Sequence, residues 1–258
     1  MLILLQPSDP LPGPDLARLA RLTGLSAYDL KTRIRAGAWG VVKALADLDA
    51  AEQLLASLRQ EGFGAVAVPT RVAYEAERHA VPVRGIALEP EQLVLRLSER
   101  DMPVPYAAVA ALVRGEVQVG RRLRPRSASS ATLRLATPAE DTSGSGDVYP
   151  AMDIHFFTVA WFARIDPRSL EFADGGEGGP VERLEQLAQL LEARTGVRVD
   201  RGAKASSLAS FAERPPPGHA LSTPPAIAGG RDSGDERFDA YSRLVAEAER
   251  AARRSSRR

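Results

Sequence analysis

The sequence predicts an α+β protein with two small folded units and a C-terminal tail. Short apolar strands alternate with amphipathic helices over residues 1–70, and extended, alternating segments dominate residues 83–205. Residues 71–82 are charged and are expected to form a linker, while Pro and Gly accumulate within residues 206–258. A chain of this length accommodates two units at roughly 100–200 residues per domain.

The first unit, residues 1–70, is expected to follow the order strand, helix, helix, strand, helix, strand. Its first helix should begin after Pro14-Asp15, and Thr23-Gly24 should separate this helix from the second. Asp47 stands where an N-cap is needed for the third helix, and Gly62 supplies the left-handed residue that stops it. The strands are expected at residues 2–5, 39–45 and 65–68. Together these elements predict a small sandwich of helices against one sheet.

Residues 15–68 resemble the C-terminal domain of the bacterial ribosomal stalk protein. The residues that match in order and near-spacing are Thr23-Gly24-Leu25, Lys31, Lys43, Ala51-Glu52, Leu54, Leu58 and Gly62. The alignment needs one inserted residue near Trp39. The resemblance implies the same fold and a docking role, because that family's domain recruits translation factors through a lysine-rich helical surface. A similar fold serves as an adaptor of an ATP-dependent protease.

The sequence departs from that family at two positions of the implied docking surface. Tyr28 stands where the family usually has a lysine, and Leu48 replaces another lysine. Lys31 and Lys43 match the pattern. These departures indicate a shared fold more than a shared function, and Tyr28, Lys31 and Lys43 are candidate partner-binding residues.

The second unit, residues 83–205, is expected to consist mainly of antiparallel strands closed by one helix. The helix should begin at Pro180 and run to Arg194, because Pro suits the first helical position. An apolar strand, a turn, a second strand, the step Val104-Pro105-Tyr106 and a terminal helix are weakly similar to pleckstrin-homology-like domains. The resemblance implies a small, partly open barrel. An α+β sheet with a packed helix is the alternative.

Residues 206–258 are expected to be a disordered linker followed by a short, basic amphipathic helix over residues 236–254. Phe238, Tyr241 and Leu244 lie on one side of this helix and are candidate partner-binding residues. An exposed apolar stripe is unfavourable in water, so we expect the helix to dock on the same chain or on a partner. A disordered, solubilising tail is the alternative.

Composition excludes several functional classes. The chain has 34 basic and 33 acidic residues and a net charge of +1, so no global charge favours nucleic acid. It has no cysteine, which excludes disulfides, thiolate metal sites and a cysteine nucleophile. The apolar start of the chain is too short for a signal peptide, and no segment reaches the roughly 20 apolar residues of a membrane span. We expect a cytoplasmic protein with no cofactor.

Asp153 and His155 are the one pair that suggests site chemistry. They lie two residues apart on an expected strand, so their side chains share a face and can form an acid–base pair or hold a metal. No third ligand has a matching spacing. The alternative, which we favour, is a half-exposed strand whose Met152, Ile154 and Phe156 face the core. The sequence therefore predicts no catalytic or metal-binding residue.

The densest internal basic cluster consists of Arg121, Arg122, Arg124 and Arg126. Guanidinium groups pair well with phosphates or with an acidic partner, but no aromatic residues lie nearby to stack on bases. A solvated loop is the alternative interpretation. The leading function is a non-enzymatic protein-binding or adaptor module with an unknown partner. Binding of nucleic acid or another anionic surface through the arginines is the alternative, and an enzyme of unrecognised type is the third.

Overall fold

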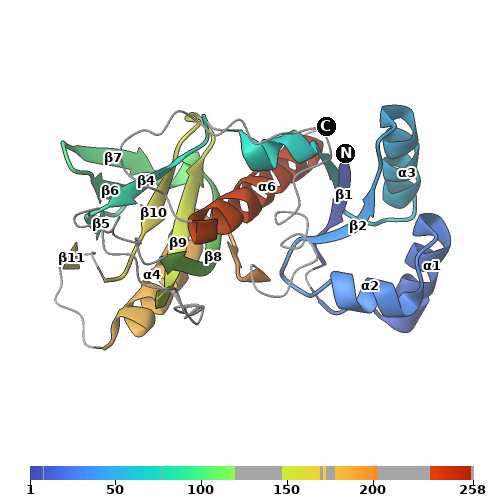
Figure 1. Cartoon of the computed structure of the whole chain (residues 1–258), viewed down its shortest axis with the longest axis horizontal. Helices are drawn as coiled ribbons and strands as arrows, with labels where there is room; N and C mark the ends of the chain where they lie inside the picture. The colour runs from blue at the N-terminus through green and yellow to red at the C-terminus, as the bar shows by residue number, and fades with distance from the viewer. Residues whose placement is uncertain are drawn as a thin grey trace, which may run out of the picture.

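The structure, a computed structural model, describes residues 1–7, 9–75, 77–119, 147–168, 171–172, 178–202 and 233–256. It has a mixed helix-and-strand architecture with several sheets, which confirms the coarse fold prediction. Figure 1 shows the N-terminal lobe (residues 1–74) at one end and the β-rich lobe (residues 80–202) at the other, with helix α6 between them. No helix in the described part is both long and apolar enough to cross a membrane.

The N-terminal lobe has the element order that the sequence predicts. Its three strands form an antiparallel sheet in the order β2-β1-β3. The Asp47 side chain caps α3 by accepting from the backbone N–H groups of Asp49 and Ala50, and Gly62 has a φ of 85°. The elements are β1 (Leu2–Leu5), α1 (Gly13–Thr23), α2 (Ala27–Arg33), β2 (Gly40–Ala44), α3 (Leu48–Gln60) and β3 (Ala65–Val68), followed by the 3₁₀ helix η1 (Thr70–Tyr74).

The start of β2 passes so close to the end of α2 that Gly40 has no room for a side chain. A Cβ atom there would lie 2.4 Å from the carbonyl oxygen of Arg33 and 3.1 Å from the Cα of Ile34. Both are backbone atoms, so the contact cannot be relieved by a rotamer change. We expect Gly40→Ala to lower the free energy of unfolding by about 1–3 kcal/mol, measured by urea denaturation.

Gly64→Ala is the matched control for this change, because nothing lies within 4 Å of the added Cβ. A surface change of this kind should stay within about 0.5 kcal/mol of the wild-type stability. Equal stability of the two variants would show that α2 and β2 are not packed as closely as described.

The β-rich lobe contains a five-stranded sheet in the order β12-β8-β9-β10-β4 and a four-stranded sheet in the order β11-β5-β6-β7. Strands β8 and β9 form a long antiparallel ladder from Val109–Phe156 to Val119–Asp147. The strands are β4 (Ala80–Val83), β5 (Gly85–Leu88), β6 (Gln92–Arg96), β7 (Asp101–Pro105), β8 (Val109–Val119), β9 (Asp147–Phe156), β10 (Phe162–Ile165), β11 (Glu171–Phe172) and β12 (Val199–Asp200); the 3₁₀ helix η2 (Tyr106–Ala108) precedes β8.

Among the described residues these sheets do not close into a barrel, so the barrel form of the prediction is not found there. The alternative of sheets with a packed helix describes the lobe better. Helix α4 (Pro180–Thr195) begins at the predicted Pro180 and buries Leu184, Leu187 and Leu191 against the core of this lobe. The finer resemblance to pleckstrin-homology-like domains stays a prediction.

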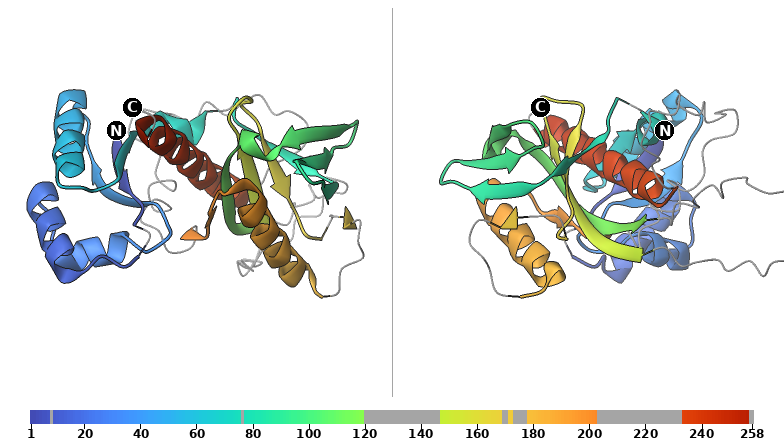
Figure 2. Two further views of the ribbon diagram at one scale, coloured as in Figure 1. Left: turned by 180° about the vertical axis from the view of Figure 1, so that it is seen from behind. Right: turned by 60° about the vertical axis from the view of Figure 1, so that its left-hand side comes forward.

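Helix α6 (Ser233–Ser256) lies between the two lobes and packs on both (Figures 1 and 2). One buried cluster joins Leu244 of α6 to Leu4 and Val66 of the N-terminal lobe and to Val113 and Val117 of β8. The helix expected over residues 236–254 is therefore present, and of the two docking sites left open by the sequence it uses its own chain, although it is longer than the short helix expected. The helix has 24 residues, docks on its own chain and forms part of the core.

Candidate functional site

A buried ionic network lies between α6 and the five-stranded sheet. Arg164 on β10 is the register partner of Asp153 on β9, and its guanidinium donates to both carboxylate oxygens at 2.8 and 2.7 Å. The same guanidinium lies 2.7 Å from a carboxylate oxygen of Asp239 on α6. Burial raises the pKa of Asp153, and the adjacent Arg164 opposes this shift. Arg164 thus joins the sheet to the helix inside the protein.

Arg243 extends this network from α6 to the segment around η1. It lies one helical turn after Asp239, at 3.3 Å from its carboxylate. The guanidinium also donates to the backbone carbonyls of Ala73 at 2.9 Å and Arg78 at 2.5 Å. These contacts fix α6 to backbone that connects the two lobes.

His155 lies beside the ionic network and contacts α6 directly. Its Nε2 is 2.7 Å from the hydroxyl oxygen of Ser242, and its ring stacks on Phe162 with 4.5 Å between the ring centroids. Burial, and then repulsion from arginines including Arg250 and Arg164, holds the pKa of His155 well below its ordinary value. The imidazole is therefore neutral at physiological pH.

A second polar cluster connects α6 to both lobes through Asp200, at the end of β12. Its carboxylate accepts a hydrogen bond from the Tyr241 hydroxyl at 2.5 Å and from the backbone N–H groups of Trp39 and Gly202. Burial raises the pKa of Asp200, and these hydrogen bonds oppose the shift. The Trp39 indole in turn donates to Glu249 of α6 at 2.9 Å.

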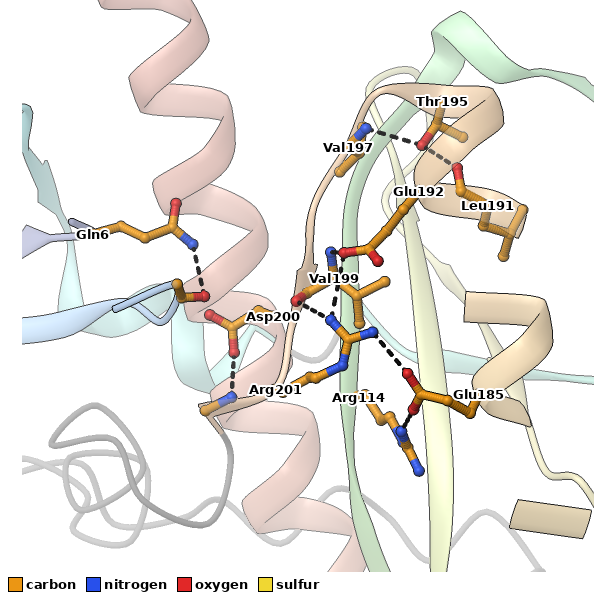
Figure 3. A network of polar contacts seen from close by, with 12 residues as sticks. Gln6, Arg114, Glu185, Leu191, Glu192, Thr195, Val197, Val199, Asp200 and Arg201 are labelled. Atoms are coloured by element: carbon orange, nitrogen blue, oxygen red, sulfur yellow. Dashed lines mark hydrogen bonds and ion pairs between the residues drawn. The ribbon is translucent and has the colours of Figure 1, made fainter. Parts of the chain in front are cut away.

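Figure 3 shows the outer edge of this region, where α4, β8 and β12 meet. Arg201 donates to Glu185 at 3.0 Å and lies 3.4 Å from Glu192, while Arg114 pairs with the other oxygen of Glu185. Glu192 also accepts from the backbone N–H of Val199 at 2.6 Å. This exposed network holds β12, and therefore Asp200, against α4.

The expectation that Asp153 and His155 share a face of one strand is confirmed. Met152 and Ile154 alternate with them and lie in the core of the β-rich lobe. The expectation of a half-exposed strand is wrong, because α6 covers the polar face and leaves the side chain of Asp153 completely buried.

The chemistry of this buried region favours attachment of the helix. Ser242 and His155 form a pair of the kind found in hydrolases, but Ser242 has no exposed surface and Asp153 is held by Arg164. No group of three potential metal ligands occurs among the residues that the structure describes. We therefore interpret the network as the contact that holds α6.

A surface depression of about 320 Å³ lies on the N-terminal lobe, near the C-terminal end of α3. Among the residues that line it are Asp15, Arg18 and Glu61. Arg18 pairs with Asp15 at 2.5 Å and with Glu61 at 3.5 Å. Arg18 is thus held by two carboxylates of the lining, and we assign no ligand to this depression.

The structure separates the predicted partner-binding residues into three groups. Tyr28 and Lys31 are exposed on α2, and Lys43 is half-buried at the end of β2. Arg121, Arg122, Arg124 and Arg126 lie outside the described residues. Phe238, Tyr241 and Leu244 are at most 4% exposed because α6 docks on its own chain, which is one of the two possibilities left open by the sequence.

Lys43 joins the end of β2 to the corner between α1 and α2. Its ammonium group donates to the backbone carbonyl of Thr23 at 2.6 Å, just before Gly24 ends α1. Tyr28 follows this corner in the first turn of α2, and Leu48 begins α3 five residues after Lys43. We call Tyr28, Lys31, Lys43 and Leu48, the four positions to which the resemblance draws attention, the corner surface; they lie on α2, at the end of β2 and at the start of α3.

Comparison with known proteins finds no family model, curated protein or solved structure that matches this chain.

Proposed function

We propose that the protein is a non-enzymatic adaptor that binds another protein through the corner surface. The observation that carries this proposal is the exposure of two large apolar side chains there, 76% for Tyr28 and 54% for Leu48. An exposed aromatic residue is a typical anchor of a protein interface, because it buries a large area at little entropic cost when bound.

The corner surface is held on a rigid base, which favours its use in binding. Ser26 caps α2 by accepting from the backbone N–H of Asp29 at 3.0 Å, and Leu30 anchors the inner face of the helix with no exposed surface. Tyr28 and Lys31 are one turn apart and are both exposed. A partner would therefore meet preorganised side chains and lose little free energy in ordering them.

The resemblance to the ribosomal stalk domain supports the same surface. It places Tyr28 and Leu48 at positions where that family carries lysines used for docking, with Lys31 and Lys43 retained. An apolar exchange at two docking positions implies a partner with an apolar contact patch and a weaker dependence on charge. Such a partner is a folded protein or an amphipathic segment.

The test compares paired charge substitutions in the full-length protein. Tyr28→Glu combined with Leu48→Glu should weaken capture of the proteins that the wild type enriches from cells of its source, by more than about tenfold if they act as anchors. Val181→Glu combined with Leu190→Glu on α4 is the matched control, since both side chains are 51% exposed. Quantitative mass spectrometry measures the capture, and thermal melts verify that both variants fold.

Two results would contradict the proposal. One is equal loss, or equal retention, of the captured proteins in the two paired variants. The other is capture that is unaffected by the corner substitutions and declines steeply with salt, because that behaviour indicates phosphate contacts and favours the arginine clusters.

A further inference from the structure

Helix α6 is attached to the rest of the core through side chains and lies in the cluster that joins both lobes. It contributes no strand to a sheet, and its contacts with both lobes are made by side chains. Residues 203–232 separate it in sequence from β12. The helix can therefore leave its place without breaking any of the described strand ladders.

We infer that α6 is a releasable latch, held across both lobes by the His155–Ser242 contact and the Arg164 network, and that mild acid releases it. Release would uncover one apolar surface that spans both lobes and includes Leu4, Val66 and Val113. The latch is independent of the corner surface, which lies on α2 and near the start of α3.

The charges around His155 make a positive charge on its imidazole unfavourable. Four arginines act on it, two of them from α6. The nearby carboxylates are already engaged by these arginines: Asp153 and Asp239 by Arg164, and Glu247 by Arg78. The charged side chains around His155 are Arg243, Arg250, Asp239 and Glu247 on α6, Arg164 on β10, Asp153 on β9, and Arg78 before β4. A protonated His155 would add positive charge to a site whose carboxylates already have partners.

The direction of the pH effect follows from where the proton binds. With α6 docked, burial and the arginines hold the pKa of His155 well below its ordinary value. With α6 released, the imidazole meets water and returns to a pKa of about 6.5. The proton therefore binds the released state. Docking is therefore strongest above about pH 6.5. Well below that value the docking equilibrium weakens by about tenfold per pH unit, until His155 takes up a proton in the docked state as well.

Hydrogen exchange on the full-length protein tests the latch. After correction for intrinsic exchange rates, the protection of α6 amides 238–250 should decrease about fivefold between pH 6.5 and 5.5, because His155 is already half protonated in the released state at pH 6.5. Amides of α4 should keep their protection, because the β-rich lobe stays folded. Parallel loss in α6 and α4 would indicate global unfolding, and unchanged protection in α6 would exclude acid release. Either result would overturn the inference.

Substitution of the histidines identifies the group that responds to pH. His155→Gln keeps a hydrogen-bonding group near Ser242 but cannot gain a proton, so the loss of α6 protection between pH 6.5 and 5.5 should disappear. The matched control is the double variant His79→Gln and His219→Gln, in which His79 is exposed and the pH dependence should remain. If the protection of α6 amides in His155→Gln still decreased between pH 6.5 and 5.5, the inference would be overturned.

Ser242→Ala provides a second variant in case His155→Gln fails to fold. It removes the hydroxyl that contacts His155 on the helix side. We expect weaker protection of α6 at every pH, with the same decrease of about fivefold between pH 6.5 and 5.5. Loss of the decrease in this variant would contradict the assignment to His155, which remains present.

Discussion

Replacement of Arg164 with methionine should lower the free energy of unfolding by about 3–5 kcal/mol. The guanidinium holds Asp153 through two hydrogen bonds and lies 2.7 Å from Asp239. Without it, two carboxylates remain in a buried site, and Asp153 has no exposed surface on which to meet water. Urea denaturation of the full-length protein at neutral pH measures the loss.

Arg168→Met is the control for the loss of an arginine. Arg168 pairs with Asp166 at 2.8 Å, but its side chain is 46% exposed, so the change should cost less than about 1 kcal/mol. Replacing Asp153 and Arg164 together with Leu and Met should recover much of the stability, because Asp239 keeps Arg243 as its partner and the buried Asp153 carboxylate is gone. Equal losses for the two single variants would show that the Arg164 network is not buried as described.

The N-terminal lobe could be predicted from sequence because its signals are local. The cap at Asp47 and the left-handed Gly62 each act within a few residues of where they stand. The buried side chains of α3, Ala51 and Leu58, likewise follow from helical spacing. Local chemistry of this kind needs no knowledge of the rest of the chain.

The segment that packs on the second face of the N-terminal sheet could not be predicted from sequence. All four residues of β1 are buried, which is typical of a strand covered on both faces. The helices of the N-terminal lobe cover Ile3 and Leu5, whereas Leu2 and Leu4 pack in the cluster that contains α6. An apolar strand indicates that a cover exists, but it does not say which segment supplies it.

The buried network was missed for a related reason. Asp153 and His155 alternate with apolar residues, which is also the pattern of a strand with one solvated face. Their helix-side contacts are far away in sequence, since Ser242 lies 87 residues after His155. One signal was present in α6 itself: Asp239, Ser242 and Arg243 interrupt its apolar side, and polar residues at such positions indicate a polar surface opposite.

The corner surface could be predicted from sequence only in part. The resemblance that pointed to Tyr28 and Lys31 depends on matches scattered between Thr23 and Gly62, and the structure places both side chains on the outside of α2. Its function stays a proposal, because exposure permits binding without specifying a partner. Variants of the corner surface test the proposed docking, and variants at the contact between His155 and α6 test the release of α6.

Leu244→Asp should have the largest effect on α6. Leu244 is 1% exposed and belongs to the apolar cluster that joins both lobes. Docking the variant helix would transfer an unpaired carboxylate out of water, at a cost of several kcal/mol. Because α6 is attached to the lobes through side chains, undocking avoids this cost. We expect amides 238–250 to lose protection and a dye that binds apolar surface to gain fluorescence.

Leu190→Asp on α4 is the matched control, because it makes the same chemical change at a side chain that is 51% exposed. It should change stability by no more than about 0.5 kcal/mol and leave α6 protected. The amides of α4 in Leu244→Asp then separate two roles for α6. If they stay protected, the β-rich lobe holds its fold without α6, as a releasable helix requires. If they exchange with those of α6, the helix is an obligatory part of one cooperative core. A variant whose α6 remains as protected as in the wild type would contradict the burial of Leu244 itself.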